Sequence, residues 1–397
     1  MSQAGAVQPI RGVQLDVGTL LQRARQAAGL TDFGDEAFLE PLAHTVGIIN
    51  AEARLRSDSE LPVHWLVGNL ADRLRLVEYL KHHPAALDEK VEVAGIIIGL
   101  PRGGSTLLQR LLCTSRQVNY TPWWELISPL PLAGEAAGDP TPRIELGKKM
   151  AQGIYDAWPE MVAMHPVEAL APDEEILLID RTLMCQMFSF YFNVPSYMPW
   201  LRTQDQSRGY SELETWLKVL QYQQPSRRGR KWLLKSPHHL VGGGLRTMLD
   251  TFRGAKAIMT HRTLENVVVS YCSMQDLMVR NYTNVFDPKL IGEQAIDVFR
   301  WAIENLIAVR RDYGEQRFID VQYRDTVERP LDVYRSTMQS MGLAVGEQDE
   351  QAARGWMESH GRDTHPPHRY RADDYGITRD QIARAFEFYD ERFLRHK

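Results

Sequence analysis

One stretch constrains the fold more than any other: an apolar run, a glycine-rich turn and a helical pattern follow each other directly. Residues 93–98 read VAGIII, and a continuous apolar run of this kind predicts a strand buried on both faces. The turn at residues 99–106 reads GLPRGGST, and the apolar spacing of residues 107–112 predicts a helix after it. A strand, a tight turn and a helix in this order are typical of parallel α/β sheets.

Three later runs repeat the pattern of a short buried strand. Residues 232–234 (WLL), 257–259 (AIM) and 318–321 (FIDV) each precede a candidate helix. Strands that alternate with helices favour a mostly parallel central sheet flanked by helices. The sequence therefore predicts an α/β fold that is P-loop-like at its first strand.

The chain divides into a helical N-terminal region and a larger α/β domain. Within residues 1–90, apolar residues recur at helical spacing over 39–49 and 66–80. Residues 91–397 are expected to form the α/β domain, with an insertion at about 131–230 that is proline-rich at first and then largely helical. We expect the N-terminal region to pack on the core and the insertion to form a helical lid over the sheet.

The last predicted helix carries a clear start signal. Thr378 and Gln381 have the spacing of a capping box, in which each side chain binds the other residue's backbone N–H. Four apolar residues then recur on one helix face: Ile382, Phe386, Tyr389 and Phe393. This spacing predicts one continuous C-terminal helix.

Composition excludes several classes of protein. In 397 residues, 46 Lys and Arg stand against 51 Asp and Glu, and the resulting net charge of -5 argues against a nucleic-acid binder. The three separated cysteines suit neither a disulfide framework nor a zinc site, which favours a reducing compartment. No apolar run approaches the ~18 residues of a membrane span, and residues 1–11 lack the pattern of a signal peptide. We therefore expect a cytoplasmic protein without a membrane span.

The glycine-rich turn has the composition of an anion-binding loop. Gly103 and Gly104 permit positive backbone φ angles, so that successive N–H groups can converge on one anion. The following helix adds the partial positive charge of its N-terminus, and Ser105 and Thr106 add hydroxyl donors. Arg102 supplies a full positive charge within the loop. The structural alternative is a strand-to-helix turn with incidental glycines.

The turn matches the nucleotide-binding P-loop only in part. Gly99, Gly104 and Thr106 are in register with that motif, but Ser105 occupies the lysine position. A nucleotide or small-molecule kinase on a degenerate P-loop is one alternative, although it would lack its main β/γ-phosphate contact. A binding protein of the same fold without chemistry is a second alternative.

A second candidate anion site follows the run at residues 257–259. Residues 260–270 read THRTLENVVVS, in which Arg262 can grip a phosphate through two parallel hydrogen bonds. Ser270 lies about two helical turns further on, close to the same helix face. Alone, the pattern also fits a surface arginine and a core-facing serine.

Together these motifs resemble those of sulfotransferases that use 3′-phosphoadenosine-5′-phosphosulfate (PAPS). Residues 101–106 (PRGGST) resemble the 5′-phosphosulfate loop, Pro-Arg/Lys-x-Gly-Thr-Thr/Ser, with a serine at one threonine position. Residues 261–270 resemble the 3′-phosphate motif His-Arg-x-x-x-x-Val-Val-x-Ser, and residues 233–240 (LLKSPHHL) resemble a segment of the large bacterial branch, which is related to the tyrosylprotein sulfotransferase type. The resemblance implies PAPS as co-substrate and no metal.

The resemblance also implies residues that bind the nucleotide. Besides residues 102–106, Arg262 and Ser270, it points to Tyr323 on the adenine or phosphate side. It further implies a basic loop that closes over the nucleotide, containing His368, Arg369 and Arg371. A solvated run of charges is the structural alternative for that loop.

Sulfuryl transfer needs cations near the leaving phosphate and a base for the acceptor hydroxyl. We expect Arg102 and Lys235 to supply the charge. For the base, Glu125 matches the position of the catalytic glutamate in the tyrosylprotein branch, and two flanking tryptophans would raise its pKa. His239 and His165 are rival bases, each with the alternative of a structural histidine.

The acceptor is expected to be a small molecule with a hydroxyl group, apolar or aromatic in character. The lid region is rich in apolar side chains that can line such a pocket, although ordinary helical core explains them equally well. These are Trp123, Trp124, Trp158, Met161, Met164, Phe188, Phe190, Tyr191, Tyr197 and Trp200.

Overall fold

The computed structural model describes residues 14–394 apart from 57–58, 285 and 360–370. Its centre is one sheet of five parallel strands in the order β2-β3-β1-β4-β5. The strands are β1 (Val93–Ile97), β2 (Val118–Asn119), β3 (Lys231–Lys235), β4 (Lys256–His261) and β5 (Phe318–Gln322). The predicted α/β fold is confirmed, and each predicted strand is present.

The connections leave the centre of the sheet in two directions. After β1 the chain continues to β2 on one side, and after β4 it continues to β5 on the other side. The carboxyl ends of the adjacent strands β1 and β4 therefore border a topological switch point. Open α/β sheets bind their ligands in the crevice at such a point.

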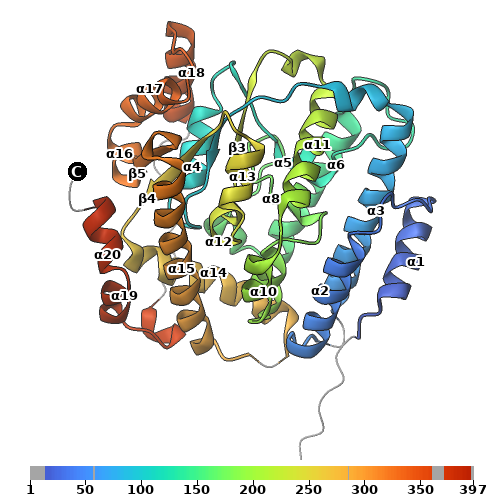
Figure 1. Cartoon of the computed structure of the whole chain (residues 1–397), viewed down its shortest axis with the longest axis horizontal. Coiled ribbons are helices and arrows are strands. Elements are labelled where there is room, and N and C mark those ends of the chain that lie inside the picture. The colour runs from blue at the N-terminus through green and yellow to red at the C-terminus, as the bar shows by residue number, and fades with distance from the viewer. Residues whose placement is uncertain (1–13, 57–58, 285, 360–370, 395–397) are drawn as a thin grey trace, which may run out of the picture.

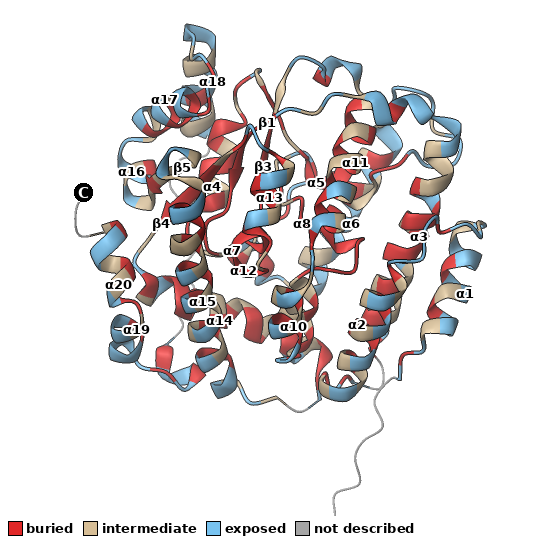
Figure 2. Cartoon of the chain, in the orientation of Figure 1, coloured by how far each residue is buried: buried red, intermediate tan, exposed pale blue. Residues whose placement is uncertain are grey.

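Helices cover both faces of the sheet, which explains why the strands are apolar without alternation. Ile96 packs in a cluster with helices of one face, and Ile97 packs in a second cluster with helices of the other. Figure 2 shows buried residues concentrated in the strands and on the inward sides of these helices. The first face carries α11 (Ser207–Gln223), α13 (Leu245–Thr251), α14 (Leu264–Tyr282) and α15 (Lys289–Tyr313), and the second carries α4 (Ser105–Leu112), α17 (Pro330–Ser340) and α18 (Glu347–Ser359).

The first helices of the chain are α1 (Val17–Ala28), α2 (Leu39–Glu52) and α3 (Leu61–His82), and they stand at one side of the molecule (Figure 1). Their apolar faces share a core cluster with Phe188, Phe192 and Tyr197 from the insertion. The helical N-terminal region therefore packs mainly on the helical lid insertion. The division of the chain near residue 90 stays a prediction. The insertion and its approach contain α5 (Trp123–Ile127), α6 (Thr141–Ala157), α7 (Met161–Met164), α8 (Ile176–Asp180), α9 (Met187–Phe192) and α10 (Tyr197–Thr203).

The C-terminal helix is shorter than the spacing of its apolar residues predicts. The capping box of Thr378 and Gln381 is present, but α19 (Arg379–Ala385) ends before Phe386, whose φ of -120° and ψ of 15° leave the helical region. A short α20 (Glu387–Tyr389) and one further turn follow. All four predicted apolar residues are nevertheless buried, because Tyr389 and Phe393 turn to pack on His261 at the end of β4. The remaining helices are α12 (His238–Val241) and α16 (Tyr323–Glu328).

The glycine in the middle of β1 is required by the packing of the sheet. A Cβ atom on Gly95 would lie 2.4 Å from Met341 Sδ and 2.9 Å from Ile258 Cδ1. We therefore expect Gly95→Ala to lower the free energy of unfolding by about 1–3 kcal/mol, measured by urea denaturation, because the added methyl group overpacks the core.

Gly153 in α6 is the matched control, since it is exposed and a Cβ atom there would meet nothing within 4 Å. Gly153→Ala should raise the free energy of unfolding by about 0.5–1 kcal/mol through helix propensity alone. Equal effects of the two substitutions would contradict the packing described for β1.

Candidate active site

The glycine-rich loop joins β1 to α4 at the carboxyl edge of the sheet. Gly104 precedes the helix with a φ of 90°, and a Cβ atom there would lie 2.2 Å from Tyr323 Cδ2. Glycine is therefore required both by the backbone and by the tyrosine ring against it. Arg102 also has a positive φ, of 67°, a strained conformation that is concentrated at functional sites. The first N–H groups of α4 have no acceptor within the helix, so they can bind a ligand.

The two predicted anion motifs meet at Arg102. Its Nε donates to Ser270 Oγ at 3.0 Å, and a second guanidinium nitrogen donates to the carbonyl of Met164 in α7. The Arg262 guanidinium donates to the carbonyl of Arg102 at 3.0 Å and lies 4.4 Å from the centre of the Tyr323 ring. The structure thus brings together residues that are up to 221 positions apart between Arg102 and Tyr323.

Lys235 is joined to the glycine-rich loop from the end of β3. Its Nζ lies 3.1 Å from Thr106 Oγ1 and 2.7 Å from Glu174 Oε1. The lysine side chain is fully buried, whereas that of Glu174 is 18% exposed. Sequence analysis gave Glu174 no role. The run of three acidic residues at 173–175 was the one local feature that could have drawn attention to it.

His239 belongs to a buried network that supports Lys235. Its Nε2 lies 2.6 Å from Glu175 Oε1, and its Nδ1 lies 2.9 Å from the hydroxyl of Tyr210. The other oxygen of Glu175 accepts the backbone N–H of Lys235 at 2.7 Å. Because the side chains of His239 and Glu175 are fully buried and both ring nitrogens are engaged, this histidine holds the strand end in position.

Glu125 lies away from Lys235 and the glycine-rich loop, in a buried ion pair with Arg227. Its two carboxylate oxygens accept hydrogen bonds from Arg227 at 2.9 and 2.8 Å, and Gln224 donates a third at 3.0 Å. The Glu125 side chain is fully buried. Arg227 lies over the ring of Trp232 at the beginning of β3, whereas Lys235 ends that strand. The structure therefore does not bring the Glu125 carboxylate to Lys235.

His165 is the more accessible of the two histidines named above. Its side chain is 32% exposed, and Nε2 lies 3.8 Å from Asp173 Oδ1. It directly follows Met164, whose carbonyl binds Arg102. His165 thus lies on the same side of the loop as α7.

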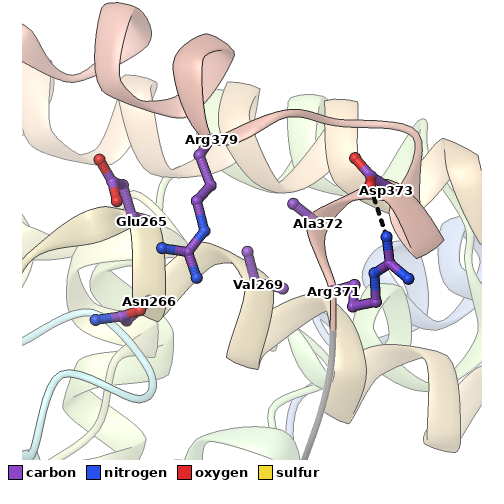
Figure 3. A pocket seen from close by; sticks show the side chains of 7 residues that line it. All are labelled: Glu265, Asn266, Val269, Arg371, Ala372, Asp373 and Arg379. Atoms are coloured by element: carbon purple, nitrogen blue, oxygen red, sulfur yellow. Dashed lines mark hydrogen bonds and ion pairs between the residues drawn. The ribbon is translucent and has the colours of Figure 1, made fainter.

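A cavity of about 340 Å³ lies beside the second anion motif (Figure 3). Glu265, Asn266 and Val269 line it from α14, the helix that carries Ser270. Arg371 and Arg379 line it from the C-terminal segment. Figure 3 shows Arg379 reaching toward α14, whereas Arg371 pairs with Asp373 at 3.4 Å. Sequence analysis did not name Arg379.

Two of the predicted residues in the basic loop, His368 and Arg369, lie outside the described residues. Within the part of the chain that the structure describes, no three His, Cys, Asp or Glu side chains are grouped to hold a metal ion. Nor does that part contain a helix with the length and apolar character needed to cross a bilayer.

Comparison with known proteins identifies the family of this chain. The family model described as the sulfotransferase family matches residues 96–347, which is more than half of the chain. The chain belongs to the sulfotransferase family. The match covers the glycine-rich loop, both anion motifs and Lys235.

Solved structures of bacterial sulfotransferases have the same fold. STF9 from Mycobacterium avium superposes with a TM-score of 0.83 at 24% sequence identity, over 98% of this chain and 98% of that one. STF1 from Mycobacterium tuberculosis H37Rv superposes with a TM-score of 0.81 at 25% identity, over 94% of this chain and 98% of that one. No curated protein matches the chain. The resemblance to sulfotransferases seen in the motifs is confirmed.

The ion pair of Glu125 allows a test of its role in this sulfotransferase. Removing one partner of a buried pair leaves the other charge uncompensated, so Glu125→Ala and Arg227→Met should each lower the free energy of unfolding by about 3–5 kcal/mol. The double variant should lose less than the sum of the two, because the partners are coupled. Denaturant unfolding measures all three.

The exposed pair of Glu145 and Lys148 provides the control. Glu145→Ala should change the free energy of unfolding by less than about 0.5 kcal/mol. A Glu125→Ala protein as stable as the wild type but without transfer activity would instead support Glu125 as the base.

Proposed function

We propose that this sulfotransferase moves the sulfuryl group of PAPS to a hydroxyl group of a small acceptor. The observation that carries the proposal is the junction of the two anion motifs at Arg102, through Ser270 and Arg262. Two linked anion sites at one sheet edge suit a nucleotide with phosphates at both the 5′ and 3′ positions. ATP offers no 3′-phosphate.

The residues of the loop and of α14 fit such a donor. Gly103, Gly104, Ser105 and Thr106 would hold the 5′-phosphosulfate through backbone N–H groups and hydroxyls. Arg262 and Ser270 would hold the 3′-phosphate, and the ring of Tyr323 would adjoin them. When bound, PAPS supplies a sulfuryl group on an oxygen that leaves with the 5′-phosphate.

The C-terminal segment would complete the donor site. Arg371 and Arg379 line the cavity beside α14 together with Glu265 and Asp373, and the two guanidinium groups are the ones that would bind an anion there. His368 and Arg369, from the same basic loop, are assigned to this role with Arg371. Their common contribution is electrostatic attraction of an anionic nucleotide.

Lys235 and Arg102 carry the positive charge that transfer requires. Lys235 already binds Thr106, the hydroxyl at the start of α4, so its ammonium group faces the phosphate loop. Charges that are fixed in a buried site stabilise developing negative charge more strongly than the same charges in water. His239 acts indirectly, because Glu175 links it to the backbone of Lys235.

For the base we propose Glu174 in place of Glu125. A base must reach the hydroxyl proton of the acceptor, and Glu174 combines partial exposure with contact to Lys235. Both oxygens of Glu125 are occupied by Arg227. Glu174 would accept the proton from the acceptor oxygen as that oxygen bonds to sulfur, while Lys235 balances the charge on the departing phosphate oxygen.

The acceptor is proposed to approach past α7, where Met164 and His165 border Arg102. Many of the aromatic side chains considered for its pocket, including Phe188 and Tyr197, are instead core. A small apolar or aromatic alcohol or phenol remains the proposed acceptor. The three cysteines are free and buried, which supports a reducing compartment such as the cytoplasm.

The donor assignment predicts selective nucleotide binding. In calorimetric titration, 3′,5′-adenosine bisphosphate should bind and ATP with Mg²⁺ should not. Arg262→Ala should weaken binding of the bisphosphate by about 10- to 100-fold, because one charge-assisted contact contributes about 1.5–3 kcal/mol. Preference for ATP would contradict the proposal and favour a kinase, and binding of neither would favour a protein without this chemistry.

The base assignment predicts a loss of turnover without a loss of donor binding. Glu174→Gln should lower kcat by about 100-fold or more, the usual contribution of a general base, while the affinity for the bisphosphate stays unchanged. Glu168→Gln is the control, because Glu168 is an exposed carboxylate that pairs with Arg110. Full activity of Glu174→Gln would exclude Glu174, and His165→Asn would then be the next variant to assay.

A further inference from the structure

A second cavity, of about 250 Å³, lies between α9, α10, α14 and α15. It contains none of the residues assigned above to the donor or to transfer. Apolar side chains line much of it, among them Phe190, Met198 and Val298. Polar side chains also line it, and the proposal rests on three of them: Arg202, Tyr271 and Gln275.

Arg202 in α10 reaches this cavity without a carboxylate partner. Its Nε donates to the carbonyl of Val241 at 3.3 Å, and one Nη donates to the carbonyl of Val298 at 3.5 Å. Its guanidinium also stacks 3.9 Å from the centre of the Trp301 ring. These contacts fix the group and leave N–H donors of the other Nη without a protein acceptor among residues 14–394 as described.

The buried arginines of the described chain differ from Arg202 because each of them forms an ion pair with a carboxylate. Each has a carboxylate within 4 Å, as the five pairs show: Arg73 with Glu212, Arg143 with Glu135, Arg181 with Asp72, Arg227 with Glu125, and Arg310 with Asp320. Arg202 is half-buried, and burial lowers its pKa to about 10, so it stays charged at neutral pH. Arg202 makes no such ion pair with any residue that the structure describes, and an anion in the cavity would therefore add to the partial compensation that the more distant charge of Asp297 provides.

Gln275 provides an independent indication of a ligand. Its residue is 4% exposed, yet its side-chain amide makes no hydrogen bond to any other described residue. Its amide group keeps accessible surface in the cavity that the residue lines, so it can bind a ligand there. The hydroxyl of Tyr271, whose pKa is raised by burial, lines the same cavity. A guanidinium, an amide and a hydroxyl thus surround one space.

The charge of the cavity limits the kind of anion. Asp297 also lines the space and adds one negative charge that interacts with Arg202. A single arginine beside an aspartate suits a ligand with one negative charge better than a phosphate dianion. We propose that this cavity binds a small monocarboxylic acid, with its carboxylate on Arg202 and Gln275 and its apolar part against Phe190, Met198 and Val298.

The test compares a carboxylate with its neutral isostere. Benzoate and benzamide are titrated calorimetrically into the full chain. Benzoate should bind at least about tenfold more tightly than benzamide, and saturating 3′,5′-adenosine bisphosphate should leave its affinity within about twofold. Arg202→Gln should weaken benzoate by about tenfold or more, whereas Arg371→Gln, at the other cavity, should not.

A second variant separates ligand binding from stability, because Arg202 also tethers two helices. Ser189 lines the cavity without any of those contacts, and Ser189→Trp should fill it and abolish benzoate binding while thermal unfolding stays close to that of the wild type. The proposal is overturned if benzoate fails to bind at ~10 mM, a concentration at which even weak small ligands are detected. It is also overturned if benzamide binds equally well, or if the bisphosphate displaces benzoate.

Discussion

The arrangement of this molecule depends on one fully buried cation, the ammonium group of Lys235. A buried charge is costly unless it is paired, and removing its partner costs more than the pair itself contributes. Glu174 and Thr106 provide the partners, one from the insertion and one from the start of α4. The sheet, the glycine-rich loop and the insertion are thereby joined at a single atom, the Nζ of Lys235.

Two adjacent carboxylates, Glu174 and Glu175, bind different groups of Lys235. Glu174 binds the ammonium group and keeps some contact with solvent, while Glu175 is wholly buried and binds the backbone N–H of the same residue. The Glu175 carboxylate is fixed in turn by His239. In the proposed mechanism one neighbour exchanges protons and the other holds the geometry, although the two residues are chemically identical. Environment alone separates their roles.

The elements that sequence analysis predicted correctly are those with local signals. The strand at residues 93–98 and the loop after it could be predicted because apolar runs, glycines and helix starts depend on near neighbours. Side-chain partners are different, because they come from remote positions. Glu125 meets Arg227 across 102 residues, and Lys235 meets Glu174 across 61. Nothing local distinguishes a carboxylate in a closed ion pair from one that pairs with Lys235, so the sequence alone did not single out Glu174.

The position of Arg102 has a consequence for how a bound nucleotide is recognised. Its side chain holds Ser270 and its carbonyl holds Arg262, so one residue belongs to both anion sites. In the proposed donor complex both phosphates would therefore depend on the same residue, and any effect of one site on the affinity of the other would be reciprocal. The binding free energies contributed by the two phosphates of the nucleotide would consequently not be independent of each other. In that complex, the free energy that one phosphate contributes to binding would depend on whether the other phosphate is present.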